Sequence, residues 1–182
     1  VSNFPLPTPR FMLDADSLRD LQAPLKARYR EDPTAALITL RAEGQLGAGI
    51  TCRVQTGQAL AEAGLHPATG GDGQALCSGD MLLEALAACA GVTLNAVATA
   101  LGIELRSGQV RAEGDLDFRG TLGVSKEAPV GFQAIRLHVS LDTDATEAQL
   151  ATLFKLTERY CVVLQTIKGN PELHLTHEVA TA

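Results

Sequence analysis

The side chains in this sequence with the clearest capacity for chemistry are four cysteines: Cys52, Cys77, Cys89 and Cys161. They are widely separated and none forms a C-x-x-C pair, so neither a zinc knuckle nor a thioredoxin-type site is indicated. A thiolate can cleave the O–O bond of a peroxide, which leaves a sulfenic acid that a second thiol condenses with to give a disulfide. Two thiols that meet inside the fold would therefore suffice for a reversible redox cycle.

Cys89 lies in the middle of a long apolar segment, where we predict a helix from a cap at Ser78 to about Leu101, closed by Gly102. The segment is apolar almost all round and residues 85–103 contain no charged side chain, so the helix must be buried. Its length approaches that of a membrane span, but it lacks flanking Lys or Arg and interfacial Trp or Tyr, and we reject a span. An isolated cysteine in such a helix usually has a structural role.

Cys161 is predicted to face the interior from a second helix. Thr146 and Gln149 form a capping box at the start of this helix, and Gly169-Asn170-Pro171 ends the helical region. Its apolar stripe consists of Leu150, Leu153, Phe154, Thr157, Cys161 and Leu164. Two inward-facing thiols on separate elements make Cys89 and Cys161 the candidate reactive pair.

The remaining segments predict strands on both sides of these helices. The predicted strands are residues 37–43 and 49–55, joined by a turn at 44–47, then 110–118, 135–141, and a closing strand with Leu173, Leu175, His177 and Val179 on one face. The order of strands, buried helix, strands, helix and strand indicates an α+β fold.

We divide the chain into an N-terminal arm and helix, residues 1–33, and one domain, residues 34–182. The arm should contain a helix from a cap at Asp16 or Ser17 to about Arg30, kinked or broken at Pro24. The net charge of −6 argues against a nucleic-acid partner. Residues 1–10 show no secretory signal, so we expect a cytoplasmic location, in which the cysteines would be thiols.

Two segments resemble those of the OsmC/Ohr family of osmotically inducible and organic hydroperoxide resistance proteins. SGDMLLEALAACAGVTLNAVATALGI, residues 78–103, is similar to the central helix of the family, in which an apolar run leads to Ala-Ala-Cys. ERYCVV, residues 158–163, is similar to its second-cysteine segment. The order of elements also matches over about residues 34–180. The resemblance implies an OsmC-like fold, with antiparallel sheets around a long central helix and an intertwined homodimer.

The resemblance further implies that Cys89 is the attacking peroxidatic thiol and Cys161 the resolving thiol of a peroxidase. Its substrates would be apolar organic hydroperoxides, and its reductant a dithiol such as a lipoylated protein. No cofactor, metal, nucleic acid or membrane partner is expected. An intertwined dimer also suits the physics, because a helix that is apolar on every side needs more cover than one small sheet provides.

The sequence departs from the family pattern at the groups that would activate the thiol. A buried thiolate has a raised pKa unless a cation or hydrogen bonds stabilise it. The hydroperoxide reductases that this chain resembles carry an arginine on the first hairpin, where it has GQLGAG at residues 44–49. They carry a glutamate before the long helix, where it has Gly79 and Asp80, and a proline commonly follows their second cysteine, where it has Val162.

Substitutes for the missing groups have alternative interpretations. Arg41, Arg53 and Arg119 could each supply the cation, or could be solvated strand residues. Asp80 could replace the acid, or could complement the helix dipole as a residue of the first turn. The dipole interpretation also applies to Glu84, which lies deeper in the helix. A second hypothesis is therefore an OsmC-fold protein without peroxidase activity, which binds a small apolar ligand or serves another redox role.

The other cysteines and the histidines carry weaker hypotheses. Cys52 shares a strand face with apolar residues and is predicted to be core, whereas Cys77 lies in a loop before the long helix. His177 is interpreted as a core histidine. A zinc site built from the scattered cysteines and histidines is disfavoured, because they lack the spacing of ligand pairs.

Overall fold

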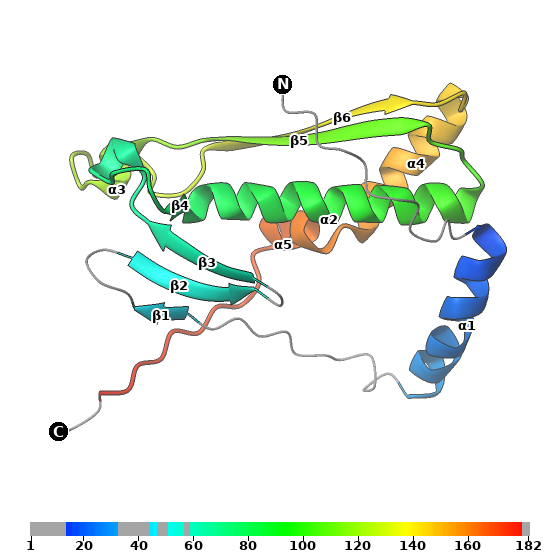
Figure 1. Cartoon of the computed structure of the whole chain (residues 1–182), viewed down its shortest axis with the longest axis horizontal. Coiled ribbons are helices and arrows are strands. Elements are labelled where there is room, and N and C mark those ends of the chain that lie inside the picture. The colour runs from blue at the N-terminus through cyan, green and yellow to red at the C-terminus, as the bar shows by residue number, and fades with distance from the viewer. Residues whose placement is uncertain (1–13, 33–43, 47–50, 57–58, 180–182) are drawn as a thin grey trace.

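The computed structural model describes residues 14–32, 44–46, 51–56 and 59–179 of the 182-residue chain. A long helix, α2 (Ser78–Leu101), runs through the middle of the molecule, with a two-stranded sheet and two shorter helices packed along it (Figure 1). A second, four-stranded sheet lies near the N-terminal end of α2. The predicted mixture of helices and strands around a central helix is confirmed.

Helix α2 begins one residue earlier than predicted and ends at Leu101 as predicted. Gly102 ends it with a φ of 66°, a left-handed conformation that glycine adopts without steric cost. The N-cap is Cys77 rather than the predicted Ser78. A stripe of residues at helical spacing is buried on α2: Leu86, Ala90, Leu94 and Ala98. By length and composition α2 could cross a membrane, but it packs against strands and helices of the same chain as a core helix.

The two-stranded sheet consists of β5 (Ser107–Asp115) and β6 (Ala134–Asp142), which pair antiparallel with Val110 opposite Val139. Half-buried and exposed residues alternate along both strands, as the sequence pattern predicted. The predicted end of β5 at Phe118 is wrong. Phe118 instead begins the short helix α3 (Phe118–Thr121), because the Asp117 side chain caps it by accepting from the Arg119 N–H.

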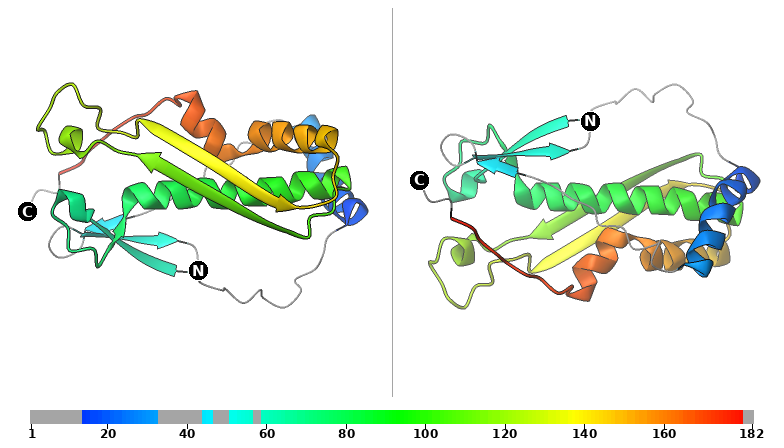
Figure 2. Two further views of the ribbon diagram at one scale, coloured as in Figure 1. Left: turned by 90° about the horizontal axis from the view of Figure 1, so that it is seen from above. Right: turned by 90° about the horizontal axis from the view of Figure 1, so that it is seen from below.

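The second predicted helix is two helices, α4 (Glu147–Tyr160) and α5 (Val162–Gly169). The capping box of Thr146 and Gln149 is present at the start of α4. The chain breaks at Cys161, whose ψ of 103° is extended rather than helical. Figure 2 shows α4 and α5 along one side of α2, beneath the crossing strands. This break creates a new helix N-terminus beside the core.

The four-stranded sheet has the order β1 (Gly44–Leu46), β2 (Thr51–Thr56), β3 (Ala59–Gly64) and β4 (Leu76–Cys77). β1 and β2 pair antiparallel, which confirms a hairpin, but residues 44–46 form its first strand rather than the predicted turn. The sequence patterns did not predict β3. The predicted strand 37–43 lies outside the described residues. The side chain of Cys52 is also not described, so its predicted burial stays a prediction.

The two ends of the chain also differ from prediction. Helix α1 (Ala15–Glu31) is capped by Asp14 rather than by the predicted Asp16 or Ser17. It continues through Pro24, so of the predicted kink or break the break is absent. The predicted closing strand is absent from residues 171–179, where Leu173 is 88% and Leu175 100% exposed. His177 is likewise exposed rather than core. A strand needs a neighbouring edge with which to pair, and no described strand of this chain pairs with the segment.

Candidate active site

The structure brings the side chains of Cys89 and Cys161 together. Cys89 is half-buried on α2, and Cys161 is 0% exposed at the junction of α4 and α5. Both are free thiols in one apolar cluster with Leu86 and Ala90, and their side chains hydrogen-bond to each other. A disulfide between them would join two elements that already pack against each other.

The N-terminus of α5 points its backbone N–H groups at this pair. The first N–H groups of a helix have no partner within the helix. Cys161, the N-cap of α5, makes no capping hydrogen bond through its side chain. Instead, the N–H groups of Val162 and Val163 donate to the sulfur of Cys89, and so does the hydroxyl of Thr93, one turn further along α2. The sulfur thus lies among four donors, counting the Cys161 thiol.

These donors lower the pKa of Cys89. Burial of the sulfur raises its pKa, but the hydrogen bonds from Val163 N–H, Cys161, Thr93 and Val162 N–H outweigh this effect. The pKa of Cys89 is therefore lowered from that of an ordinary thiol. A lowered pKa increases the fraction of thiolate, the nucleophilic form of the side chain, at neutral pH.

Cys161 shows the opposite behaviour. Burial is the largest effect and raises its pKa, while the N–H of Leu164 lowers it and the neighbouring Cys89 raises it again. The pKa of Cys161 is raised overall, mainly because the sulfur is buried and further because two adjacent sulfurs cannot both carry charge at low cost. Of the two sulfurs, that of Cys89 therefore ionises at the lower pH.

The expected arginine is not the source of stabilisation in the described part of the chain. Arg119 lies on α3, where it pairs with Asp117 at 2.6 Å. Arg41 and the side chain of Arg53 lie outside the described residues. The group that the sequence reasoning missed is the N-terminus of α5, because a continuous helix was predicted there. The β-branched pair Val162-Val163 is a weak signal for the break, since such residues lower helix propensity.

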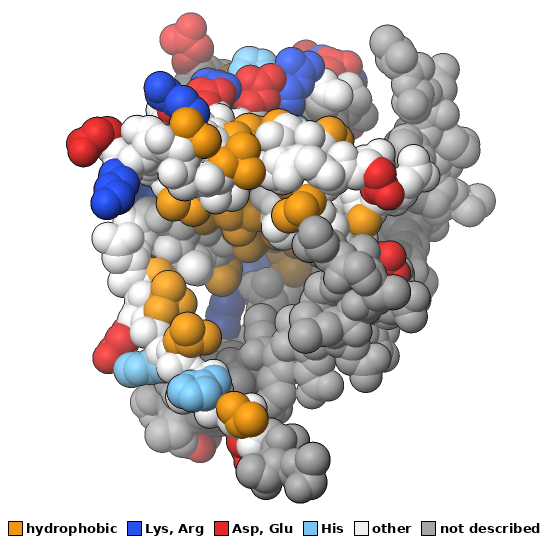
Figure 3. All heavy atoms as spheres, turned by 90° about the vertical axis from the view of Figure 1, so that its left-hand side faces the viewer, with side chains coloured by type: hydrophobic (Ala, Val, Ile, Leu, Met, Phe, Trp, Pro, Cys, Tyr) orange, Lys and Arg blue, Asp and Glu red, His pale blue; other side chains and the backbone are white. Residues whose placement is uncertain are grey.

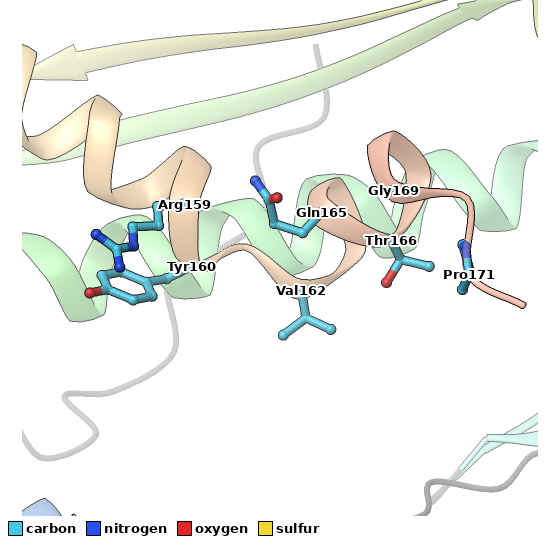
Figure 4. A pocket seen from close by; sticks show the side chains of 7 residues that line it. All are labelled: Arg159, Tyr160, Val162, Gln165, Thr166, Gly169 and Pro171. Atoms are coloured by element: carbon cyan, nitrogen blue, oxygen red, sulfur yellow. The ribbon is translucent and has the colours of Figure 1, made fainter.

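A pocket of about 430 Å³ lies on the outer side of α5 (Figure 4). Its lining residues are Arg159, Tyr160, Val162, Gln165, Thr166, Gly169 and Pro171. Val162 and Thr166 point away from the β5–β6 sheet, and the guanidinium of Arg159 lies 5.4 Å from the centre of the Tyr160 ring. Val162 thus contributes its N–H to Cys89 and its side chain to the pocket.

Comparison with protein families gives a match to the OsmC-like protein family over residues 71–176, more than half of the chain. The chain belongs to the OsmC family. The match includes both Cys89 and Cys161. No curated protein matches the sequence.

Solved structures of OsmC proteins share this fold at low identity. An OsmC-like protein from Mycoplasma pneumoniae is 17% identical, with a TM-score of 0.62 over 73% of this chain and 89% of its own. An organic hydroperoxide resistance protein OsmC from Legionella pneumophila is 21% identical, with a TM-score of 0.57 over 74% and 92%. An organic hydroperoxide resistance protein from Elizabethkingia anophelis is 18% identical, with a TM-score of 0.59 over 74% and 91%.

The other candidate residues of this OsmC protein lie elsewhere on α2. Cys77 and Asp80 line a separate cavity of about 350 Å³ together with His66, whose ring stacks on Phe118 at 5.0 Å. Glu84 is exposed. Within the described ranges, no group of three or more His, Cys, Asp or Glu side chains could hold a metal ion. Neither Asp80 nor Glu84 contributes to the pKa shifts of the thiol pair.

Proposed function

We propose that this OsmC protein is a thiol peroxidase that reduces organic hydroperoxides through a disulfide cycle between Cys89 and Cys161. One observation carries the proposal: two hydrogen-bonded thiols in which the pKa of Cys89 is lowered and that of Cys161 raised. A peroxidase needs this division, because the attacking sulfur must be ionised while the resolving thiol keeps its proton.

The reaction follows from these protonation states. The Cys89 thiolate attacks the hydroxyl-bearing oxygen of the peroxide, an S–O bond forms, the O–O bond breaks, and the alkoxide takes a proton from water and leaves as an alcohol. Cys89 is then a sulfenic acid. The sulfur of Cys161 attacks the sulfur of Cys89, the S–S bond forms, the S–O bond breaks, and the hydroxyl leaves as water with the proton of the Cys161 thiol. A dithiol reductant restores both thiols by disulfide exchange and is itself oxidised to a disulfide.

The surroundings support an apolar substrate. The thiol pair lies in a cluster with Leu86 and Ala90, and Val110, Ile135 and Leu137 pack against it. Such a lining favours the hydrocarbon part of an organic hydroperoxide over hydrogen peroxide. The relatives from Legionella pneumophila and Elizabethkingia anophelis are named as organic hydroperoxide resistance proteins. We propose the same substrate class here, with a lipoylated protein as a candidate reductant and the cytoplasm as the location.

We further propose that the protein works as an intertwined homodimer, with residues 34–182 as its domain and 1–33 as an added arm. Large apolar side chains that a single chain leaves open support the proposal: Val92 is 71%, Val162 68% and Leu175 100% exposed. Figure 3 shows hydrophobic side chains open to solvent on one face of the molecule. The residues 171–179 would gain strand partners from a second copy. Light scattering should give twice the mass of one chain, and a monomer would overturn this proposal.

The peroxidase proposal is tested by counting thiols. Reduced protein is mixed with one equivalent of cumene hydroperoxide, and free thiols are titrated. Wild-type protein should lose two thiols, and mass spectrometry should find them as a disulfide between Cys89 and Cys161. Cys89→Ser should abolish the loss, whereas the matched variant Cys77→Ser should retain it. No loss in the wild type, or equal loss in Cys89→Ser, would eliminate the peroxidase.

A second candidate function rests on the pocket of about 430 Å³ beside α5. Its apolar lining by Tyr160, Val162 and Pro171 suits a small apolar ligand, which the protein would bind without peroxidase activity. The same thiol titration separates the two functions, because a binding protein would leave its thiols intact. A fluorescent apolar probe that binds the wild type but not Val162→Asp, in a protein whose thiols do not respond to peroxide, would favour the binding function.

A further inference from the structure

The chain break at Cys161 separates two backbone groups that a continuous helix would pair. The N–H of Cys161 donates to the carbonyl of Thr157 at 3.0 Å, which is the last helical hydrogen bond of α4. One residue later, a continuous helix would join the N–H of Val162 to the carbonyl of Glu158. No backbone hydrogen bond among the described residues joins these two groups. The Glu158 carbonyl therefore needs a different donor.

The side chain of Gln165 supplies this donor. Its amide nitrogen Nε2 donates to the Glu158 carbonyl at 2.7 Å. The backbone N–H of Gln165 donates to the carbonyl of Cys161 at 2.9 Å and so begins the hydrogen bonding of α5. Figure 4 shows the Gln165 side chain directed from α5 toward the end of α4. One residue of α5 thus binds both the last turn of α4 and the residue at which the chain breaks.

Two other contacts hold α5 in place, and they differ from the Gln165 bond. Leu164 and Ile167 pack against the apolar cluster of the thiol pair. On the exposed side, Lys168 pairs with the carboxylate of Glu158 at 2.6 Å, and an ion pair exposed in this way contributes little. Only the Gln165 amide occupies the carbonyl that a continuous helix would use. Among these contacts it is therefore the one specific to the break.

We propose that Gln165 is a positioning residue that keeps the chain extended at Cys161 and thereby keeps the Cys161 thiol beside Cys89. A helix that continued through Cys161 would have to displace the Gln165 amide from the Glu158 carbonyl. While the amide stays bound, the Val162 N–H remains outside the hydrogen bonding of α4. The inference rests on the proposed function, because it names a residue that positions the resolving thiol.

The test measures how readily the two thiols join without peroxide. Reduced protein is treated with diamide, which takes up the two thiol hydrogens as the disulfide forms, and the Cys89–Cys161 disulfide is followed by peptide mass spectrometry. Gln165→Met keeps the length of the side chain without the donor, and Gln165→Glu keeps its shape with a carboxylate that only accepts. Both should slow disulfide formation by roughly fivefold, as the loss of one hydrogen bond requires. Gln165 is exposed, so both variants should fold.

The variant Val162→Pro decides whether Gln165 acts through the break. Proline has no N–H to return to the Glu158 carbonyl, and its ring would clash with that carbonyl in a continuous helix. In a protein that already carries Val162→Pro, adding Gln165→Met should therefore change the rate by less than about twofold. The matched control Lys168→Met removes only the ion pair to Glu158 and should stay within about twofold of wild type.

The Cα chemical shift of Cys161 reports its backbone conformation directly. Wild type should show the shift of an extended residue, and Gln165→Met should move it toward the helical value. An unchanged disulfide rate in both Gln165 variants, or an unchanged Cys161 shift in Gln165→Met, would overturn the inference. Equal slowing by Gln165→Met with and without Val162→Pro, or equal slowing by Lys168→Met, would overturn it as well.

The outcome is independent of the peroxidase test. Slower diamide oxidation in Gln165→Met, combined with wild-type protein that keeps its thiols in cumene hydroperoxide, would retain the positioning role of Gln165 and reject the peroxidase. An unchanged diamide rate in the Gln165 variants, combined with peroxide-driven loss of two thiols in the wild type, would retain the peroxidase and reject the role of Gln165.

Discussion

Helix α2 carries cysteines in two different settings. Cys77 is the N-cap of a 24-residue helix, the position at which a helix most favours negative charge, yet its side chain makes no capping hydrogen bond. Cys89 lies in the middle of the same helix and receives N–H donors from a different helix, α5. The N–H groups of a helix terminus stabilise a thiolate only when they point at its sulfur.

The two settings also differ in what encloses them. The cavity beside Cys77 is lined by the carboxylates of Asp80 and Asp115 and by the imidazole of His66. The surroundings of Cys89 are mainly aliphatic, with the Thr93 hydroxyl and the Cys161 thiol as side-chain donors. An apolar enclosure strengthens each hydrogen bond to a thiolate, because little water competes for the sulfur.

The largest expected effect is on the free energy of unfolding, when a leucine is shortened beside each of the two cysteines. Leu86 is 0% exposed beside Cys161, whereas Leu83 is half-buried at the cavity of Cys77. Leu86→Ala should lower the free energy of unfolding by about 2–5 kcal/mol. Leu83→Ala should cost about half as much, because less of its surface is buried. Urea denaturation measures both, and equal losses would contradict the difference in packing.

The next effect contrasts the two sulfurs of the pair. Because the pKa of Cys89 is lowered and that of Cys161 raised, the thiolate form of Cys89 persists to lower pH. At pH 7, iodoacetamide should therefore modify Cys89 at least about tenfold faster than Cys161. The rate at Cys89 should reach half its maximum at a lower pH than the rate at Cys161. A reversed order would break the assignment of roles.

A smaller effect tests the N–H of Val162. Val162→Pro removes this donor while leaving the first position of α5 compatible with a helix, since proline suits that position. The preceding Cys161 is already extended, with φ −71° and ψ 103°, as a residue before proline prefers. Alkylation of Cys89 at pH 7 should slow by about threefold, because one of several donors is lost.

Val162→Ala is the matched variant, because it keeps the N–H and shortens the side chain. Its alkylation profile at Cys89 should equal that of wild type. If alkylation of Cys89 slows as much in Val162→Ala as in Val162→Pro, the effect comes from the side chain of Val162. The Val162 N–H would then not lower the pKa of Cys89.

The smallest effect concerns the other end of α2. Cys77 has the φ of −81° and ψ of 128° that an N-cap requires, but its side chain does not cap. Cys77→Ser should supply the missing hydrogen bond and raise the free energy of unfolding by about 0.5 kcal/mol. Thermal denaturation detects this gain, and a decrease would show that the thiol packs better than we describe.

Local patterns predicted much of the architecture. The bounds of α2, its closure at Gly102, the capping box at Thr146 and the alternation of β6 all follow from neighbours in sequence. The pair of Cys89 and Cys161 was also predicted, from two inward-facing positions and a family resemblance. Of the kink or break predicted in α1 at Pro24, the break is absent, although proline usually disfavours a helix interior.

What the sequence alone determined was the long helix α2, the start of α4, the strand β6 and the two thiols that face the core, because helical and strand periodicity are properties of short segments. Only the tertiary structure decided which groups lower the pKa of Cys89. The break at Cys161 and the approach of α5 to α2 place N–H groups beside a sulfur far away in the chain. No local pattern specifies that contact, since it arises from the packing of three helices around a shared core.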